Sequence, residues 1–247
     1  MKLRYKIKLA YDGTRYAGYQ SQPGSISVQQ VLEEALEYVN RSPVRVHGSS
    51  RTDAGVHAKG FVAHFDLDHK IPTTALVRAI NAHLPPDIRV MGAAKTKPDF
   101  DARKWAKGKE YRYFLYNANI LPPHLAPYWV SVFRKMDVDA MQKAAKYFIG
   151  EHDFAPFAAN PHRELSSTVR NIFDFTVTKN GPRIVMKVKG DGFLYKQVRS
   201  MAGFLIRVGQ GDEKPEAVKE ILDALEPRTA RVPTAPGKGL FLWKVWY

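Results

Sequence analysis

Residues 2–11 read Lys-Leu-Arg-Tyr-Lys-Ile-Lys-Leu-Ala-Tyr, and residues 28–39 read Val-Gln-Gln-Val-Leu-Glu-Glu-Ala-Leu-Glu-Tyr-Val. In the first stretch apolar side chains alternate with basic ones, which predicts a strand with one buried face. In the second stretch the apolar side chains recur at helical spacing and line one side of a helix. Ser27 and Gln30 have the spacing of a capping pair at the start of this helix. The two stretches therefore predict a strand followed by a helix.

The rest of the first half continues this pattern of short elements. The sequence predicts a short strand, a loop, a second strand, a helix that Pro85-Pro86 stops, and a closing strand. These elements are expected at residues 44–47, 48–60, 61–66, 73–84 and 88–92. The order of elements in the first half is therefore βαββαβ.

The second half has a similar order of elements. It begins with a strand over residues 110–116, and Asp137 is expected to cap the next helix, which Gly150 ends. Asn180-Gly181 is typical of a tight hairpin turn between two alternating strands. The elements expected after this helix are strands at residues 173–177 and 184–188, helices at 193–208 and 215–225, and a strand at 241–247. This is again βαββαβ, with one extra helix.

Two halves with this order predict an α+β fold built from two ferredoxin-like, RRM-like units. We expect the first half to span residues 1–104 and the second residues 105–247. The two sheets are expected to join into one continuous antiparallel sheet with a central cleft and with helices on one face. The halves share their order of elements but no obvious sequence, so the repeat is topological.

The composition is that of a basic protein with enough apolar residues for a packed core. Lys plus Arg number 38 and Asp plus Glu number 24, which gives a net charge of +14. An excess of this sign favours a polyanionic partner, either a nucleic acid or a membrane surface. No run approaches the roughly 20 apolar residues that a membrane-spanning helix needs. The absence of cysteine excludes disulfides, and with a start that does not resemble a signal peptide it indicates a cytoplasmic protein.

The expected loop over residues 48–60 reads Gly-Ser-Ser-Arg-Thr-Asp-Ala-Gly-Val-His-Ala-Lys-Gly. It holds an arginine and an aspartate two positions apart, Arg51 and Asp53, between two apolar strands. Loops fixed by a scaffold often carry binding and catalytic side chains. The alternative is an ordinary turn, since Asp followed by a small residue and Gly is common turn composition.

The string from Arg51 to Ala58 resembles the active-site motif of the tRNA pseudouridine synthase A family. The resemblance implies that Asp53 is the catalytic aspartate and that Arg51 helps to displace the target base. The implied reaction isomerises uridine to pseudouridine, with no redox change, no group donor and no cofactor. Whether Asp53 attacks the sugar C1′ or removes the 2′ proton stays open.

Two further segments resemble motifs of the same family. In Lys109-Glu110-Tyr111-Arg112-Tyr113 the resemblance implies that Tyr111 contacts the target base, although alternating tyrosines on a strand usually form one packed face. In the segment from Phe193 to Gly203 it implies that Arg199 pairs with the catalytic aspartate. The alternative for Arg199 is a solvated charge on a helix.

The resemblance extends over nearly the whole chain, from Tyr11-Asp12-Gly13-Thr14 to Phe241-Leu242-Trp243. It implies a tRNA substrate, modified at uridines 38, 39 and 40 of the anticodon stem-loop, and a homodimer as the working form. Ser50 departs from the family, which commonly has glycine just before the arginine, and Pro156 replaces a usual small polar residue. The change to Ser50 bears on the backbone freedom of the loop and leaves the implied site residues in place.

Three other interpretations of the sequence compete with this one, namely a metal site, an RNA-binding protein and a hydrolase. Four of the eight histidines lie within residues 47–69, but they lack the spacing of a metal site, and we expect no metal. A non-catalytic RNA-binding protein with tandem RRM-like folds is suggested by Lys59-Gly60-Phe61-Val62-Ala63-His64-Phe65, which loosely resembles an RNP1 strand. A nucleoside hydrolase normally needs a second carboxylate, and the three motifs offer only Asp191 and Glu110.

Overall fold

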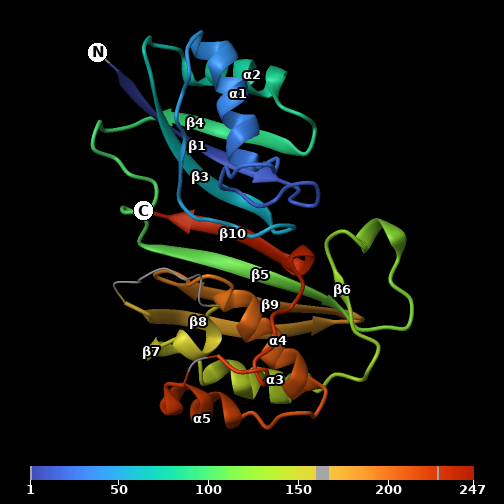
Figure 1. The fold of residues 1–247 in the computed structure, drawn as a ribbon. Coiled ribbons are helices and arrows are strands. Elements are labelled where there is room, and N and C mark those ends of the chain that lie inside the picture. Colours follow the sequence, from blue (N-terminus) through green and yellow to red (C-terminus); the bar gives the residue numbers. More distant parts are fainter. Residues whose placement is uncertain (1, 160–166, 227) are drawn as a thin grey trace. The chain divides into compact units, whose positions relative to one another are not determined.

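The computed structural model describes residues 2–159, 167–226 and 228–247 (Figure 1). The chain forms two compact units. The first comprises residues 1–107 together with 241–247, and the second comprises residues 108–240. Each unit combines a sheet with helices, so the predicted α+β class is confirmed. The final strand belongs to the first unit, whereas the order of elements in the sequence predicts it at the end of the second half.

The first unit is a sheet with strand order β4-β1-β3-β10, with β2 paired to β3. Strand β1 is antiparallel to both β3 and β4, but β10 runs parallel to β3. The sheet is therefore mixed and not purely antiparallel. Its elements are β1 (Leu3–Tyr11), α1 (Val28–Asn40), β2 (His47–Gly48), β3 (His57–Leu67), α2 (Thr73–His83), β4 (Ile88–Lys95) and β10 (Leu240–Trp246).

The alternation that predicted β1 decides which of its side chains are buried. Tyr5, Ile7 and Leu9 are at most 1% exposed, while the basic side chains between them point to the other face of the sheet. Helix α1 begins as predicted, because the Ser27 hydroxyl accepts a hydrogen bond from the Gln30 amide at 3.2 Å. The helix then buries its apolar stripe within the unit.

The second unit is a sheet with strand order β5-β9-β8-β7, with β6 paired to β5. The four main strands are antiparallel, and β6 is parallel to β5. Helix α3 packs on β8 and on α4. The elements are β5 (Gly108–Tyr116), β6 (Val130–Ser131), α3 (Val138–Lys146), β7 (Gly150–Asp153), β8 (Val169–Asn180), β9 (Arg183–Gly190), α4 (Gln197–Gly209) and α5 (Ala217–Ala224). Three short 3₁₀ turns lie at Pro123–Leu125, Ala155–Phe157 and Gly237–Gly239.

The predicted hairpin between β8 and β9 is confirmed. Asn180 pairs with Arg183 across a two-residue turn, and Gly181 has a φ of +56°. Gly at the first turn position followed by Pro182 matches a type II′ turn, whose twist suits two antiparallel strands. The sequence signal for this hairpin is local, which explains why it could be located accurately.

Several predicted boundaries differ from the structure. Strand β3 begins at His57 and not at residue 61, so the loop before it is shorter than expected. Gly150 does not end α3, which stops at Lys146. Gly150 instead opens β7 with a φ of +109°. Helix α4 begins at Gln197 and not at residue 193, because Lys196 has a φ of +59°, which no helix accommodates.

One smaller difference concerns a short strand of the first unit, and two further observations concern the start of α2 and membrane-spanning helices. The short strand expected at residues 44–47 lies at β2, and the residue that precedes α2 is Pro72, without a side-chain cap. Over the described residues, no helix is long and apolar enough to cross a membrane.

Candidate active site

The loop between β2 and β3 carries both Arg51 and Asp53. Arg51 is exposed and Asp53 is partly buried. The Val56 amide donates a hydrogen bond to the Asp53 carbonyl at 3.1 Å, and Gly55 has a φ of +73°. These features define a type II turn over residues 53–56. The loop is therefore a turn, as one interpretation of the sequence predicts, and the same residues carry the family motif. The turn fixes the backbone on the C-terminal side of Asp53.

Thr52 fixes the backbone on the other side of Asp53. Its carbonyl accepts a hydrogen bond from the Tyr19 amide at 3.0 Å. Its hydroxyl lies 2.8 Å from the hydroxyl of Tyr11, and both side chains are buried. The residue next to Asp53 is thus held through its main chain and its side chain at once.

Two glycines allow the segment over residues 12–19 to lie directly on this loop. A Cβ atom at Gly13 would lie 2.0 Å from the Val56 carbonyl oxygen. A Cβ atom at Gly18 would lie 2.5 Å from the Thr52 carbonyl oxygen. Real Cβ atoms do not approach oxygen so closely, so both positions require glycine.

Helix α1 holds the segment over residues 12–19 in turn. The amide of Val28, the first residue of the helix, donates to the Gly18 carbonyl at 3.2 Å. The Gln29 amide donates to the Tyr19 carbonyl at 2.9 Å. The first amides of a helix have no partner inside the helix, so these bonds satisfy donors that would otherwise need water or a side chain.

His57 is buried within the first unit. Its Nδ1 lies 3.0 Å from the Gly13 amide and 3.1 Å from the Asp12 carboxylate. Its ring stacks on Phe241 with centroids 4.5 Å apart. His57 thus connects the 12–19 segment to β3 and to β10. Within residues 2–159, 167–226 and 228–247, no three His, Asp or Glu side chains are grouped so that they could hold a metal ion.

Tyr111 and Tyr113 point to the same side of β5 in the second unit, but their surroundings differ. The Tyr111 and Phe193 rings form a T-shaped pair with centroids 5.2 Å apart, and 7% of Tyr111 is exposed. Tyr113 is 1% exposed, and its hydroxyl donates to the Pro236 carbonyl at 2.9 Å. Burial raises the pKa of Tyr113 above its ordinary value. The hydroxyl of Tyr113 thus has a structural partner.

Arg199 lies in the first turn of α4 and is partly buried. Its Nε donates a hydrogen bond to the Ala235 carbonyl at 2.8 Å, and the Ala235 amide donates to the Arg199 carbonyl at 3.0 Å. Arg199 is therefore attached to the segment before β10 and is not a solvated charge on an open helix face.

The four residues singled out in the sequence fall in two places. Arg51 and Asp53 share one loop of the first unit, and Tyr111 and Arg199 belong to the second unit. The sequence patterns indicate no role for the residues that hold the loop, which are Tyr11, Gly13, Gly18, Thr52 and His57. The string from Tyr11 to Thr14 carries only the family resemblance, and Gly18 carries no signal beyond its residue type.

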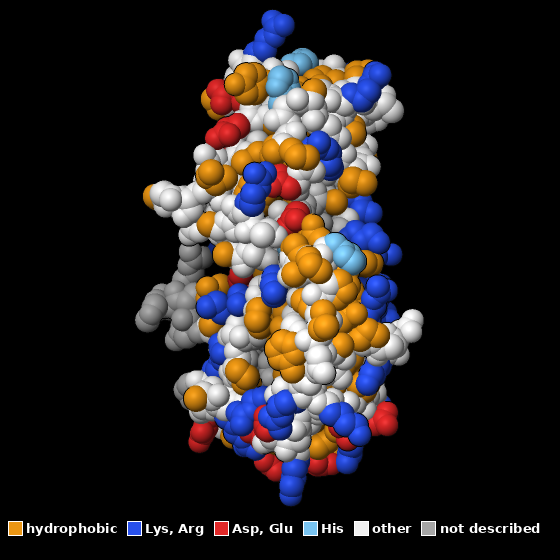
Figure 2. Space-filling view, turned by 90° about the vertical axis from the view of Figure 1, so that its right-hand side faces the viewer, with side chains coloured by type: hydrophobic (Ala, Val, Ile, Leu, Met, Phe, Trp, Pro, Cys, Tyr) orange, Lys and Arg blue, Asp and Glu red, His pale blue; other side chains and the backbone are white. Residues whose placement is uncertain are grey.

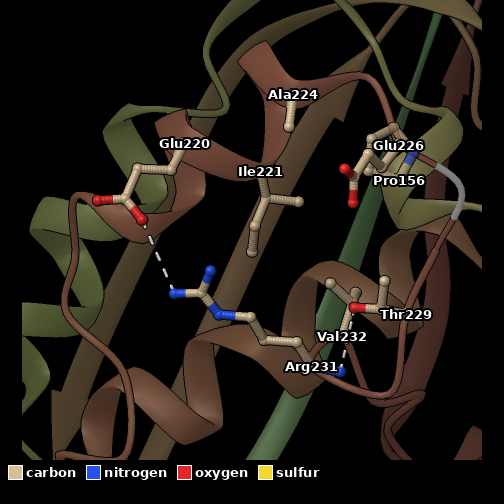
Figure 3. A pocket seen from close by; sticks show the side chains of 8 residues that line it. All are labelled: Pro156, Glu220, Ile221, Ala224, Glu226, Thr229, Arg231 and Val232. Carbon is tan, nitrogen blue, oxygen red and sulfur yellow. Dashed lines mark hydrogen bonds and ion pairs between the residues drawn. The ribbon is translucent and has the colours of Figure 1, made fainter.

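A pocket of about 400 Å³ lies elsewhere in the second unit, around α5 (Figure 3). The Arg231 side chain extends along it toward Glu220, at an ion-pair distance of 3.8 Å, and pairs more closely with Glu213 at 2.8 Å. The residues that line the pocket are Pro156, Glu220, Ile221, Ala224, Glu226, Thr229, Arg231 and Val232. None of the four candidate site residues is among them.

Comparison with known proteins identifies the family. The family model described as tRNA pseudouridine synthase matches residues 8–103 and 144–247, which include Arg51, Asp53 and Arg199 but not Tyr111. A tRNA pseudouridine synthase A from Limosilactobacillus fermentum is 44% identical over 249 residues, covering 99% of this chain and 96% of the relative. One from Pelobacter propionicus is 44% identical over 242 residues, covering 98% of each chain. A tRNA pseudouridine synthase A 2 from Clostridium perfringens is 40% identical, again with 98% of each chain covered. These matches show that the chain belongs to the tRNA pseudouridine synthase family and is a pseudouridine synthase, an isomerase.

Proposed function

We propose that this enzyme converts uridine to pseudouridine at positions 38, 39 and 40 of the tRNA anticodon stem-loop, with Asp53 as its catalytic carboxylate. The observation that carries the proposal is the Arg51-Thr52-Asp53 string, whose backbone is held on both sides of Asp53 by hydrogen bonds. A side chain on a loop fixed in this way loses little conformational entropy when it reaches the geometry needed for reaction with a substrate.

The reaction needs one carboxylate and no added reagent. The N1–C1′ bond breaks, the uracil turns, and a C5–C1′ bond forms. The C5 proton leaves and N1 gains a proton, so the product is an isomer of the substrate. Asp53 either adds to C1′ as a nucleophile or removes the 2′ proton as a base, and both roles require an ionised carboxylate. No cofactor is needed for either.

The other three residues have proposed roles that suit their side chains. Arg51, exposed in the same loop, occupies the space that the target base leaves when it is extruded. Tyr111 stacks on the extruded base. Arg199 pairs with Asp53, since a nearby guanidinium favours the ionised form of a carboxylate. These assignments rest on the family resemblance of the three motifs.

A tRNA partner agrees with the charge of the protein. The net charge is +14, and Figure 2 shows Lys and Arg side chains spread widely over one face. Contacts between such side chains and phosphates supply affinity without reading sequence, so the choice of uridine must come from the site. We propose that the enzyme acts on tRNA in the cytoplasm.

We propose a homodimer as the working form, as the family resemblance implies. Support comes from residues 117–133, which contain no Asp, Glu, Lys or Arg in a strongly basic chain. Ile120 is 80% exposed and Phe133 is 67% exposed in or at the end of this segment. Interface cores are depleted in charge and enriched in aromatic residues. Light scattering on the wild type and on Ile120→Lys tests the proposal, and a wild-type monomer at working concentration would refute it.

The assay that tests the function compares Asp53→Asn with the wild type on unmodified tRNA. The substitution keeps the size of the side chain but removes its charge, and we expect a folded, tRNA-binding protein that makes no pseudouridine. Identification of the reaction product also separates the alternative functions. Free uracil would indicate a hydrolase, and unchanged RNA would indicate a binding protein. Substantial pseudouridine formation by Asp53→Asn would refute the assignment of this loop as the active site.

A further inference from the structure

The loop that carries Asp53 has no regular secondary structure between Arg51 and the start of β3, apart from the turn over residues 53–56. Its precision must therefore come from contacts with other parts of the chain. Catalysis of an isomerisation at a sugar carbon demands a fixed carboxylate, because a misplacement of about 1 Å can cost about a hundredfold in rate. The contacts that hold this loop are thus candidates for a functional role.

Those contacts form one chain of bonds that begins on a rigid element. The first two amides of helix α1 hold the carbonyls of Gly18 and Tyr19. The Tyr19 amide holds the Thr52 carbonyl at 3.0 Å, and the Tyr19 ring is itself stacked on Phe61 of β3 with centroids 4.2 Å apart. The main chain at Thr52 is thereby fixed relative to both α1 and β3.

The side chain of Thr52 adds a second attachment, to strand β1. Its hydroxyl and that of Tyr11 are 2.8 Å apart, and the residues are 7% and 4% exposed. A buried pair of hydroxyls gives a directional contact that a packed methyl group would not give. Thr52 precedes Asp53 directly, so any rotation of the Thr52 backbone moves the Asp53 carboxylate.

We propose that Thr52, through the hydrogen bond between its hydroxyl and that of Tyr11, is a positioning residue for Asp53. Neither residue touches the substrate in this proposal. Their joint effect is to hold the turn over residues 53–56 in the conformation in which Asp53 reaches the target nucleotide. This inference rests on the proposed catalytic role of Asp53. It adds that the hydrogen bond between Thr52 and Tyr11 places the Asp53 carboxylate.

The first experiment compares Thr52→Val with Thr52→Ser. Valine keeps the branched shape and removes the hydroxyl, whereas serine keeps the hydroxyl. We expect Thr52→Val to lower the single-turnover rate at saturating enzyme by about a hundredfold while the affinity for tRNA stays unchanged. Thr52→Ser is expected to recover most of that rate. Equal rates for Thr52→Val and the wild type would overturn the proposal.

The second experiment removes the partner hydroxyl and includes a matched control. Tyr11→Phe is compared with Tyr5→Phe, because both tyrosines lie on β1, both are buried, and both hydroxyls are hydrogen-bonded. The Tyr5 hydroxyl bonds to the backbone of Ile71, in another part of the unit. We expect a lower single-turnover rate only in Tyr11→Phe. A purely structural role would make the two variants alike in stability and in rate, and that result would overturn the proposal.

The double variant Tyr11→Phe with Thr52→Val tests whether the hydroxyls act as a pair. Its rate is expected to be no lower than that of Thr52→Val alone, because a bond that is already broken cannot be lost twice. Additive losses would contradict a shared hydrogen bond. Asp53→Asn is measured in parallel. An active Asp53→Asn would refute the proposed function itself, whereas an inactive Asp53→Asn beside a fully active Thr52→Val would refute the positioning role alone.

Discussion

Gly18 lies directly against the main chain of Thr52, so close that a Cβ atom at position 18 would be 2.5 Å from the Thr52 carbonyl oxygen. Gly18 also has a φ of +100°, a conformation that other residues adopt only at a cost. The requirement for glycine is therefore both conformational and steric. The steric requirement arises at the Thr52 carbonyl oxygen, and Thr52 directly precedes Asp53. A larger residue at position 18 would therefore displace the backbone next to the proposed catalytic carboxylate.

We expect Gly18→Ala to lose activity, because the added methyl group must push the Thr52 carbonyl and the loop away. Gly24→Ala is the matched control, since Gly24 has a φ of +76° but nothing within 4 Å of its added Cβ atom. Both variants carry a backbone strain of about 1–2 kcal/mol. Thermal unfolding and the rate on tRNA are measured for both. Similar rates in the two variants would show that the steric contact has no bearing on catalysis.

Acidification is expected to destabilise the first unit through His64. This side chain is 4% exposed, and its Nδ1 accepts a hydrogen bond from the Ala102 amide at 3.1 Å. Burial, with further contributions from His47 and Arg4, lowers the pKa of His64 below its ordinary value. The unfolded chain therefore binds a proton at a higher pH than the folded chain does. The free energy of unfolding falls as the pH drops below about 6.5, the ordinary value for histidine.

Urea unfolding at about pH 7.5 and about pH 5.5 measures this effect. In His64→Asn the side chain keeps an acceptor but cannot gain a proton in this range, so the loss on acidification is expected to shrink. His69→Asn replaces an exposed histidine and serves as the control. An equal pH dependence in His64→Asn and the wild type would assign the effect to other groups.

The hydroxyl of Tyr111 is expected to matter for turnover more than for tRNA binding. Tyr111→Phe keeps the ring that stacks on the base, so its affinity should stay near the wild-type value while its rate falls. Tyr111→Ala should also weaken binding of the extruded base by about 1–3 kcal/mol. Tyr113→Phe is the control, because that hydroxyl bonds to the Pro236 carbonyl. Its loss should cost about 0.5–1.5 kcal/mol of stability and leave the rate intact.

Arg51 is expected to matter most when the target uridine lies in a folded stem. Extruding a stacked and paired base costs a few kcal/mol, and an unstructured strand avoids most of that cost. Arg51→Ala should therefore lose more activity on a stem-loop than on a short unstructured oligonucleotide. Arg45→Ala, which removes another exposed arginine, controls for the loss of charge. Equal losses on the two substrates would point to a different role for Arg51.

Binding of tRNA is expected to weaken steeply as salt is added. The net charge of +14 favours phosphate contacts, each of which releases counterions from the RNA. A titration of binding across a salt series gives the slope of the logarithm of affinity against the logarithm of salt concentration. A slope near zero would mean that nonelectrostatic contacts dominate and that the basic composition has another cause.

Local patterns in the sequence predicted the local parts of the fold. The alternation in β1, the cap at Ser27 and the hairpin that follows Asn180 each depend on neighbouring residues. The first two lie where the sequence indicated, and the turn lies one residue further along, at Gly181 and Pro182. The errors at Gly150 and Lys196 have the same origin. A glycine after a helix commonly ends it, and a lysine rarely takes a positive φ, so local statistics favour the wrong boundary in both cases.

Long-range contacts were beyond such patterns. Asp53 and Arg51 can be singled out because the residues of their motif are contiguous in the sequence. The residues that hold this motif in place are not contiguous with it. The hydroxyl of Tyr11 meets that of Thr52 across 41 positions of sequence. No local pattern around Tyr11 or Thr52 indicates that the two residues are in contact. The pairing of β10 with β3 likewise has no local signal in the sequence.

The position of β10 bears on the order in which the protein can be completed during synthesis. Residues 1–107 contain every other element of the first unit, but Phe241 of β10 pairs with His57 at the start of β3 and stacks on its ring. A ribosome must therefore translate the entire second unit before the strand that finishes the first becomes available. Domains generally fold as their chains emerge, the N-terminal one first, but here the nascent N-terminal unit stays short of one strand until residues 241–247 leave the exit tunnel.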